Sequence, residues 1–186
     1  MKRFFEYGGI AASVVLIAFG IGAIVVGLDG RDRVRDDLAR ERIVGTPDSS
    51  IPGQLVDTGK EAEAFAAVMR RHALEATDGR TYSEMGRFLD ESGEETDDEK
   101  AAAKDSKTGQ PVENAARNIW VTETALATAL NVAYFAESVA EFAAVMGLAL
   151  LLTGIGFLVL TIRMVLARRR EEQPSAAQGR PGAELS

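Results

Sequence analysis

Residues 112–167 read VENAARNIWVTETALATALNVAYFAESVAEFAAVMGLALLLTGIGFLVLTIRMVLA, and this stretch decides the fold. Its second part, 142–162, is a run of 21 residues without a charge. At about 1.5 Å per residue such a helix is roughly 32 Å long, which matches the hydrocarbon thickness of a bilayer. No Gly or Pro occurs from 112 to 146. The sequence therefore predicts one helix, with Pro111 in its first turn, that starts outside the membrane and ends inside the cell.

A second apolar run, residues 8–28, also has 21 residues and no charge. Lys2 and Arg3 precede it, and the aromatic residues 4, 5 and 7 fit a position at the membrane interface. The run is longer than the core of a signal peptide and ends without an Ala-x-Ala pattern. We therefore expect an uncleaved membrane anchor.

Positive charges predict the orientation of the two anchors. Arg163 and the arginines at 168–170 follow the second run, whereas about 15 residues before it contain none. Both termini are therefore expected in the cytoplasm, with residues 29–141 outside. This middle region holds 14 Lys and Arg against 24 Asp and Glu, a net charge of −10. Such an acidic surface argues against binding nucleic acid or anionic lipid.

The expected architecture is all-α, with two transmembrane helices joined by an extracytoplasmic helical domain. The second membrane helix is expected to be continuous with a long outer helix. The expected segments are a cytoplasmic N-terminus (1–7), the first membrane helix (8–28), the outer domain (29–141), the second membrane helix (142–162) and a basic, disordered cytoplasmic tail (163–186).

Local signals divide the outer domain. Thr58 and Glu61 have the spacing of a capping box, so a helix should run from there to about Ala76. Residues 82–89 fit a short helix or a strand. Residues 90–110 are acidic and poor in apolar side chains, which predicts a mobile loop. Whether the first membrane helix continues unbroken past Gly30 stays open.

Two neighbouring faces of the long helix are predicted to pack against other helices, and the remaining arc is predicted to be solvated. The first face, the apolar seam, steps by four and three residues. The apolar seam consists of Val121, Ala125, Thr128, Val132, Phe135, Val139, Phe142 and Met146. The second face, the small-residue stripe, consists of Thr122, Ala129, Ala133, Ala136, Ala140, Ala143, Gly147 and Gly154. The remaining polar arc consists of Arg117, Glu123, Thr124, Asn131, Glu137, Ser138 and Glu141.

Two large aromatic residues, Trp120 and Tyr134, fall on the arc that otherwise reads as polar. One interpretation covers Trp120 with the face of Phe65, Met69 and His72 from the preceding helix, which makes a small bundle. The other leaves an aromatic exposed as an anchor for a partner. The candidate interaction residues are thus Trp120, Tyr134, Ala136, Ala140, Gly147 and Gly154.

Catalytic patterns do not occur in the sequence. There is no phosphate loop, no Gly-x-Ser-x-Gly, no His-Glu-x-x-His and no cysteine. His72 is the only histidine, and nothing in the sequence completes a metal site around it. We expect no catalytic residue, no cofactor and no metal, and therefore no enzyme.

Three segments carry a resemblance: EYGGIAASVVLIAFGIGAIVVG (6–27), FAAVMRRHALEAT (65–77) and ARNIWVTETALATAL (116–130). They resemble a family of uncharacterised two-pass bacterial membrane proteins with an outer domain between the anchors. The resemblance implies a bacterial plasma membrane location and lends no activity, cofactor or catalytic residue.

Two functions stay open. The first is a non-enzymatic interaction or scaffold protein whose outer domain binds a membrane-protein partner or another copy of the chain. The second is a sensory or accessory subunit of a membrane complex that responds to an extracytoplasmic ligand. In both, the bilayer is the other partner, and nucleic acid is not one.

Overall fold

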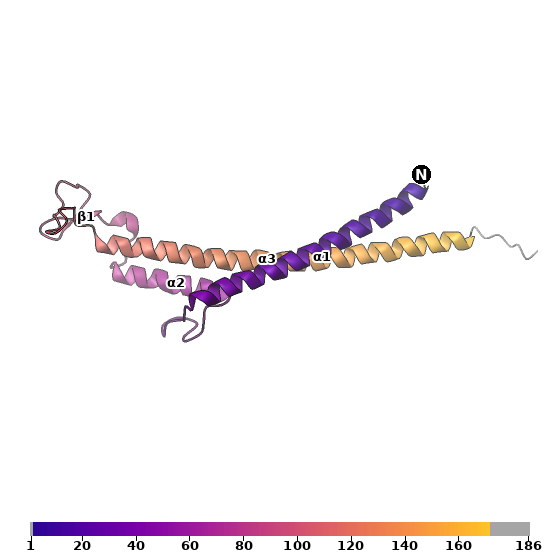
Figure 1. The fold of residues 1–186 in the computed structure, drawn as a ribbon, viewed down its shortest axis with the longest axis horizontal. Coiled ribbons are helices and arrows are strands. Elements are labelled where there is room, and N and C mark those ends of the chain that lie inside the picture. Colours follow the sequence, from indigo (N-terminus) through magenta and orange to yellow (C-terminus); the bar gives the residue numbers. More distant parts are fainter. Residues whose placement is uncertain (1, 172–186) are drawn as a thin grey trace, which may run out of the picture. The chain divides into compact units, whose positions relative to one another are not determined.

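A computed structural model describes residues 2–171 of the chain. Within these residues it has three α-helices, one short 3-10 helix and a two-stranded antiparallel sheet (Figure 1). The elements are α1 (Lys2–Glu41), α2 (Gly59–Ala76), η1 (Tyr82–Glu84), β1 (Phe88–Leu89), β2 (Glu95–Thr96) and α3 (Ala115–Glu171). The chain is thus mostly helical, with two long apolar helices, as predicted.

The chain divides into two compact units. Unit 1 consists of Met1–Leu28 and Glu141–Ser186, and unit 2 of Asp29–Ala140. Both α1 and α3 contain stretches that are long and apolar enough to cross a membrane. Only 11% of the most apolar window of each helix is buried, so almost all of this apolar surface faces outward.

Both long helices extend beyond the predicted membrane segments. Gly27 and Gly30 do not interrupt α1, which runs to Glu41. A Cβ on Gly30 would lie 3.6 Å from the Cβ of Ala140, so the glycine lies close to α3. At the other end of the chain, α3 continues through the arginines to Glu171, where positive side chains suit the helix dipole. The rest of the predicted disordered tail lies outside the described residues.

The predicted start of α3 needs a correction. Residues 111–113 are not helical, because Pro111 pairs with Lys104 and Glu113 with Phe88 in isolated β-bridges. The helix begins at Ala115, and the side chain of Asn114 accepts a hydrogen bond from the backbone N–H of Ala116 at 3.1 Å. Asn is a strong N-cap residue, and here it replaces the proline start that we predicted.

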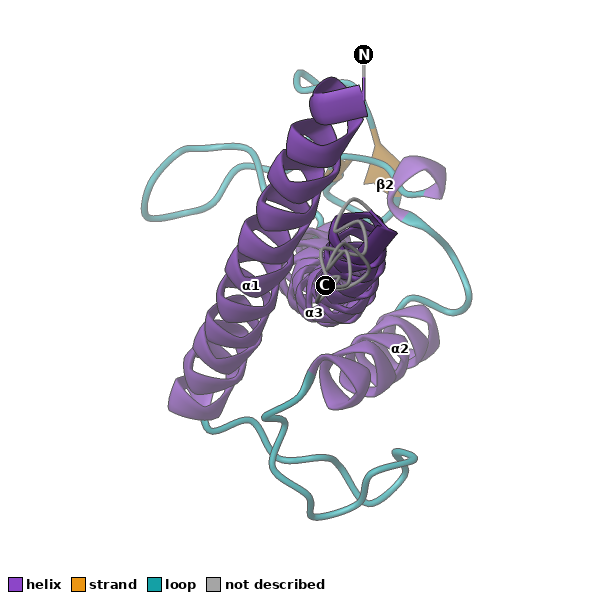
Figure 2. Cartoon of the chain, turned by 90° about the vertical axis from the view of Figure 1, so that its right-hand side faces the viewer, coloured by secondary structure: helices purple, strands orange, loops and turns teal. Residues whose placement is uncertain are grey.

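The main core of unit 2 joins α1, α2 and α3. Leu38 of α1, Phe65 of α2 and Leu130 of α3 are buried together, and Val56 from the loop between α1 and α2 closes the cluster. Figure 2, which looks along α3, shows α2 beside it. The capping box of α2 is present as predicted: Thr58 and Glu61 bond each other's backbone N–H groups.

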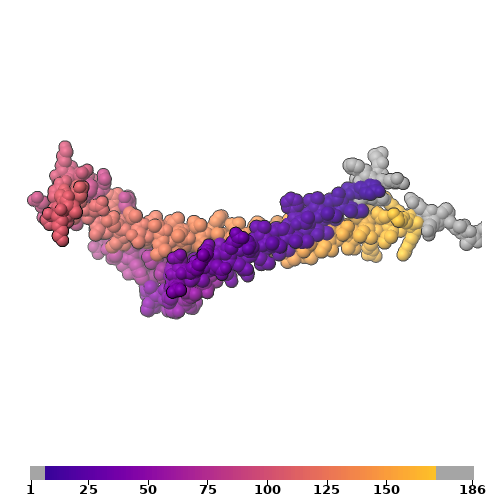
Figure 3. Space-filling model, viewed as in Figure 1, coloured from indigo at the N-terminus to yellow at the C-terminus, as the bar shows by residue number. Residues whose placement is uncertain are grey.

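The turns and short strands between α2 and α3 gather into one lobe (Figure 3). Residues 82–89 contain both predicted alternatives, since η1 is followed by β1. Residues 90–110, predicted as a loop, contain β2 and a turn in which Asp90 accepts hydrogen bonds from Ser92 and Glu94. Gly93 takes the positive φ of 86° that this turn requires. The small sheet is the difference from the all-α prediction.

Candidate interaction surfaces

Glycines form the contact between α1 and α3 in unit 1. A Cβ built on Gly147 would lie 2.7 Å from both the carbonyl oxygen of Gly20 and the backbone nitrogen of Ile24. One on Gly154 would lie 2.9 Å from the backbone nitrogen of Ile17. Real Cβ atoms do not approach this closely, so the two backbones touch only because these side chains are absent. The structure therefore brings two residues of the small-residue stripe, Gly147 and Gly154, against α1.

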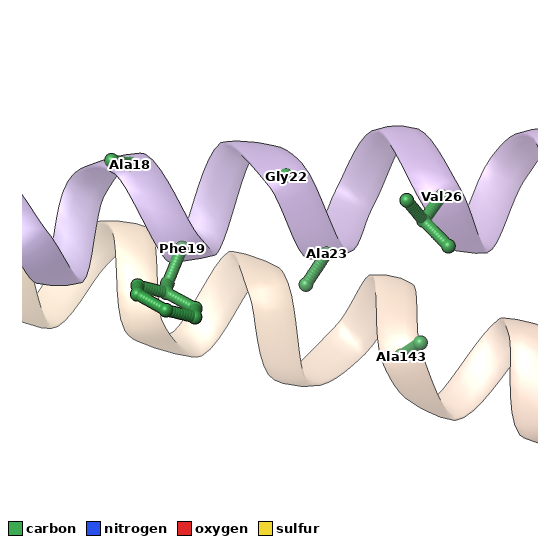
Figure 4. Close-up of a pocket in the computed structure, with 6 residues that line it drawn as sticks. All are labelled: Ala18, Phe19, Gly22, Ala23, Val26 and Ala143. Atoms are coloured by element: carbon green, nitrogen blue, oxygen red, sulfur yellow. The ribbon is translucent and has the colours of Figure 1, made fainter.

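The surface of the same helix pair is apolar and hollowed. A hollow of about 530 Å³ is lined by side chains of α1 and by Ala143 of α3 (Figure 4). In Figure 4, Phe19 and Ala23 point from α1 toward α3. Every group that lines the hollow is apolar, which suits contact with hydrocarbon and offers a polar ligand no partner.

The other two small residues singled out from the sequence, Ala136 and Ala140, lie in unit 2. Ala140 lies close to Gly30, as described above. Ala136 lines a groove of about 510 Å³ between α1 and α3, together with Leu38 and Val132. These small side chains let α1 approach in one place and leave an open groove in the other, which is lined mostly by apolar side chains and also by Asp37 and Glu41 of α1.

Trp120 is inside unit 2, with 4% of its surface exposed. Its ring packs with Ala73 and Met85, and Nε1 donates hydrogen bonds to the carbonyl oxygen of Arg80 at 2.8 Å and to the hydroxyl of Thr77 at 3.2 Å. The cover is intramolecular and comes from the end of α2 and the segment after it. The prediction placed this cover one helical turn or more too far toward the start of α2. Phe65 and Met69 instead belong to the main core.

Glu137 joins all three helices of unit 2. Its carboxylate accepts a hydrogen bond from Arg35 Nε of α1 at 2.5 Å and another from the backbone N–H of Gly59, at the start of α2. A negative charge at a helix N-terminus is favourable. A Cβ on Gly59 would lie 2.8 Å from the Cα of Tyr134, so the approach needs a glycine. Tyr134 is half-buried beside this junction.

The sequence prediction for the faces of α3 is wrong for the apolar seam and for two acidic residues of the polar arc, whereas Thr124, Asn131, Ser138 and Glu141 are exposed as predicted. Glu137, assigned to the solvated arc, is 5% exposed, and Glu123 is buried as well. The apolar seam, assigned to a neighbouring helix, is exposed along its whole length: Val132 is 58% and Phe135 67% exposed. The reason is that Arg35 and the α2 N-terminus satisfy the Glu137 charge, which lets this face turn inward.

His72 is half-exposed on α2 and contacts the loop before that helix. Its Nε2 lies 2.7 Å from a carboxylate oxygen of Asp48, which Arg71 also contacts. This triad ties the 44–56 loop to α2. Within residues 2–171, no group of three or more His, Asp or Glu side chains is placed to hold a metal ion.

Two acidic side chains of the lobe, Asp90 and Asp105, hold turns. Asp105 accepts hydrogen bonds from the backbone N–H groups of Thr108 and Lys107, which lower the pKa of its carboxyl. A hydrogen bond from the Ser92 hydroxyl lowers the pKa of Asp90 in the same way. Neither the sequence nor the geometry assigns these carboxylates another role.

Comparison of the chain with family models gives no match, and neither does comparison with curated proteins or with solved structures. The family resemblance of the three quoted segments therefore stays a prediction.

Proposed function

We propose that the chain is an integral membrane protein that acts without catalysis, as an interaction or scaffold protein of the plasma membrane. In this proposal unit 1 is a two-helix anchor with both termini in the cytoplasm. Unit 2 is the extracytoplasmic domain that binds the partner. A bacterial cell is the proposed setting.

The observation that carries the proposal is the outward-facing apolar surface of unit 1. Residues such as Phe19, Val26 and Leu160 are more than half exposed, and the helix contact is made by glycines. In water this surface would be a large aggregation site, whereas in a bilayer it is solvated by acyl chains. Glycine contacts are also typical of helix pairs in lipid, where burial of apolar surface does not drive association.

A topology reporter tests the placement. A reporter active only outside the cytoplasm should work when inserted between Asp105 and Gln110 and should fail when fused after Arg170. The expected cause is the arginine cluster, which favours the cytoplasmic side. Activity after Arg170 and none within the loop would overturn the proposed orientation.

A sensory or accessory subunit is the second candidate. It is favoured by the continuity of α1 and α3, each of which runs without a break from one unit into the other. In such a subunit, a ligand bound by unit 2 would act on unit 1 through these two helices. Purification in mild detergent separates the candidates: a stoichiometric different protein supports the accessory role, and a self-associated species supports the scaffold.

A further inference from the structure

In unit 2, the apolar seam of α3 is not covered by any other part of the described chain. This unit 2 seam consists of six residues, all exposed: Val121, Ala125, Thr128, Val132, Phe135 and Val139. They follow steps of four and three, which places them at the a and d positions of a heptad repeat. The buried residues Glu123, Leu130 and Glu137 fall at the f position, on the opposite side of the helix. One face of α3 thus holds unit 2 together, and the other is free.

We propose that the unit 2 seam binds the same seam of a second copy in a parallel two-stranded coiled coil. This proposal rests on the proposed function, because two copies anchored in one membrane point the same way. Their α3 helices are then parallel, and each heptad position meets its own equivalent, as a two-fold symmetric interface requires. Valine at the a positions 132 and 139 is β-branched, as is common at the a positions of two-stranded coiled coils.

Charge favours a second copy over an unrelated partner. Unit 2 is strongly acidic, so two copies repel wherever their charged faces meet. The positions flanking the seam, e and g, carry no charge at all: they are Thr122, Thr124, Ala129, Asn131, Ala136 and Ser138. Two such chains can therefore pair along the seam of α3 with no carboxylate at its flanking positions, although Asp37 and Glu41 of α1 line the adjoining groove.

The shape of this face is self-complementary. Phe135 projects from a d position, and a bulky residue there needs space beside the partner helix. The small e residues Ala129 and Ala136 provide it, because they line the groove of about 510 Å³ between α1 and α3. Each copy therefore offers both a projecting ring and a hollow for the ring of the other.

Acyl chains do not fit as the occupant. Phe135 lies two residues from Glu137, which contacts Arg35 of α1. At this level α1 also exposes Asp32, Arg33 and Asp36. These charges would have to enter hydrocarbon if the seam did, which is strongly unfavourable.

Single-cysteine crosslinking in membranes tests the pairing, because the chain has no cysteine of its own. Val121→Cys, Val132→Cys and Val139→Cys are each oxidised mildly in the full-length chain. A parallel, in-register pair predicts a disulfide-linked homodimer for all three. Ala67→Cys, exposed on α2, is the matched control and should give none. Crosslinking at Val132 alone, crosslinking to a different protein, or seam yields no higher than the control would each overturn the proposal.

A charge in the seam gives an independent measurement. Phe135→Asp should weaken homodimer formation in detergent by about thirtyfold or more, since buried aromatic anchors contribute at least 2 kcal/mol. Val44→Asp, an exposed apolar position outside α3, should leave it unchanged. Equal behaviour of the two variants contradicts the pairing.

The same variants separate this inference from the proposed function. Ala67→Cys should react in intact cells with a maleimide that does not cross membranes. If it reacts and the seam cysteines do not crosslink, the placement stands and the pairing is wrong. If it reacts only after the cells are opened, the proposed placement fails.

Discussion

The two long helices meet in both units, and they do so by opposite means. In unit 1 the contact consists of backbone against backbone at Gly20, Gly147 and Gly154. In unit 2 it consists of large side chains, Leu38 and Leu130, together with the ion pair between Arg35 and Glu137. The contact between α1 and α3 thus depends on glycines, which have no side chain, in unit 1 and on large side chains in unit 2.

This difference follows from the solvent proposed for each unit. In water, burial of a large apolar side chain stabilises a contact by about 1.5–3 kcal/mol. In lipid that gain disappears, and close packing of small residues takes its place. The comparison predicts that deleting a side chain harms unit 2 and that adding one harms unit 1.

The largest expected effect is in unit 2. Trp120→Ala should lower the free energy of unfolding of this unit by about 3–5 kcal/mol, because it empties a buried site. Trp120→Phe keeps an aromatic ring, although a smaller one, and loses the two hydrogen bonds, so it should cost at least about 1 kcal/mol but less than Trp120→Ala. Denaturant unfolding in mild detergent measures both.

Fluorescence of the unaltered protein checks the same site, since Trp120 is the only tryptophan. Its emission should be blue-shifted and protected from iodide. Red-shifted, readily quenched emission would show that unit 2 does not close over Trp120.

The second effect is in unit 1. Gly147→Leu forces side-chain atoms into the backbone of α1 and should cost about 1–3 kcal/mol through overpacking. Gly156→Leu is the matched control on the same helix, because a Cβ there meets nothing within 4 Å. Leu148, half exposed, should likewise tolerate a change of size. Stability of the helix pair in detergent is the measurement, and equal tolerance at 147 and 156 would remove the close-packing argument.

The smallest effect concerns the lobe. Glu95 accepts hydrogen bonds from the Gly86 N–H, Asn114 and Arg80, each at 3.0 Å, and these lower its pKa from the ordinary 4.5. A carboxyl with a lowered pKa in the folded state stabilises that state above its ordinary pKa. The contribution is lost as the pH falls through the lowered value.

Glu95→Gln should therefore cost at most about 1 kcal/mol at pH 7. The difference from the unaltered protein should shrink as the pH falls below about 4.5, where the unaltered carboxyl begins to lose its advantage. Unfolding curves of both proteins between pH 7 and pH 3 measure it. A difference that grows toward low pH would contradict the assignment.

Sequence patterns predicted where the helices begin and end better than they predicted which surfaces those helices contact. The capping box at Thr58, the end of α2 at Ala76 and the continuity of α3 are local properties, and they are confirmed. The prediction was wrong for the apolar seam of α3, which is exposed, and for Glu123 and Glu137, which are buried, because a heptad pattern indicates a packing face without identifying its neighbour. Glu137 could not be placed from the sequence, since its partners Arg35 and Gly59 are 102 and 78 residues away.

The junction at Glu137 also sets the order of events during biosynthesis. The first two helices lack their shared partner until α3 has been made, so unit 2 has no closed core while its first 80 or so residues emerge. Until then Phe65 and Leu38 are exposed to proteases and to other unfolded chains. We expect unit 2 to complete its fold only after α3 has been synthesised through Glu137, as one late, cooperative step.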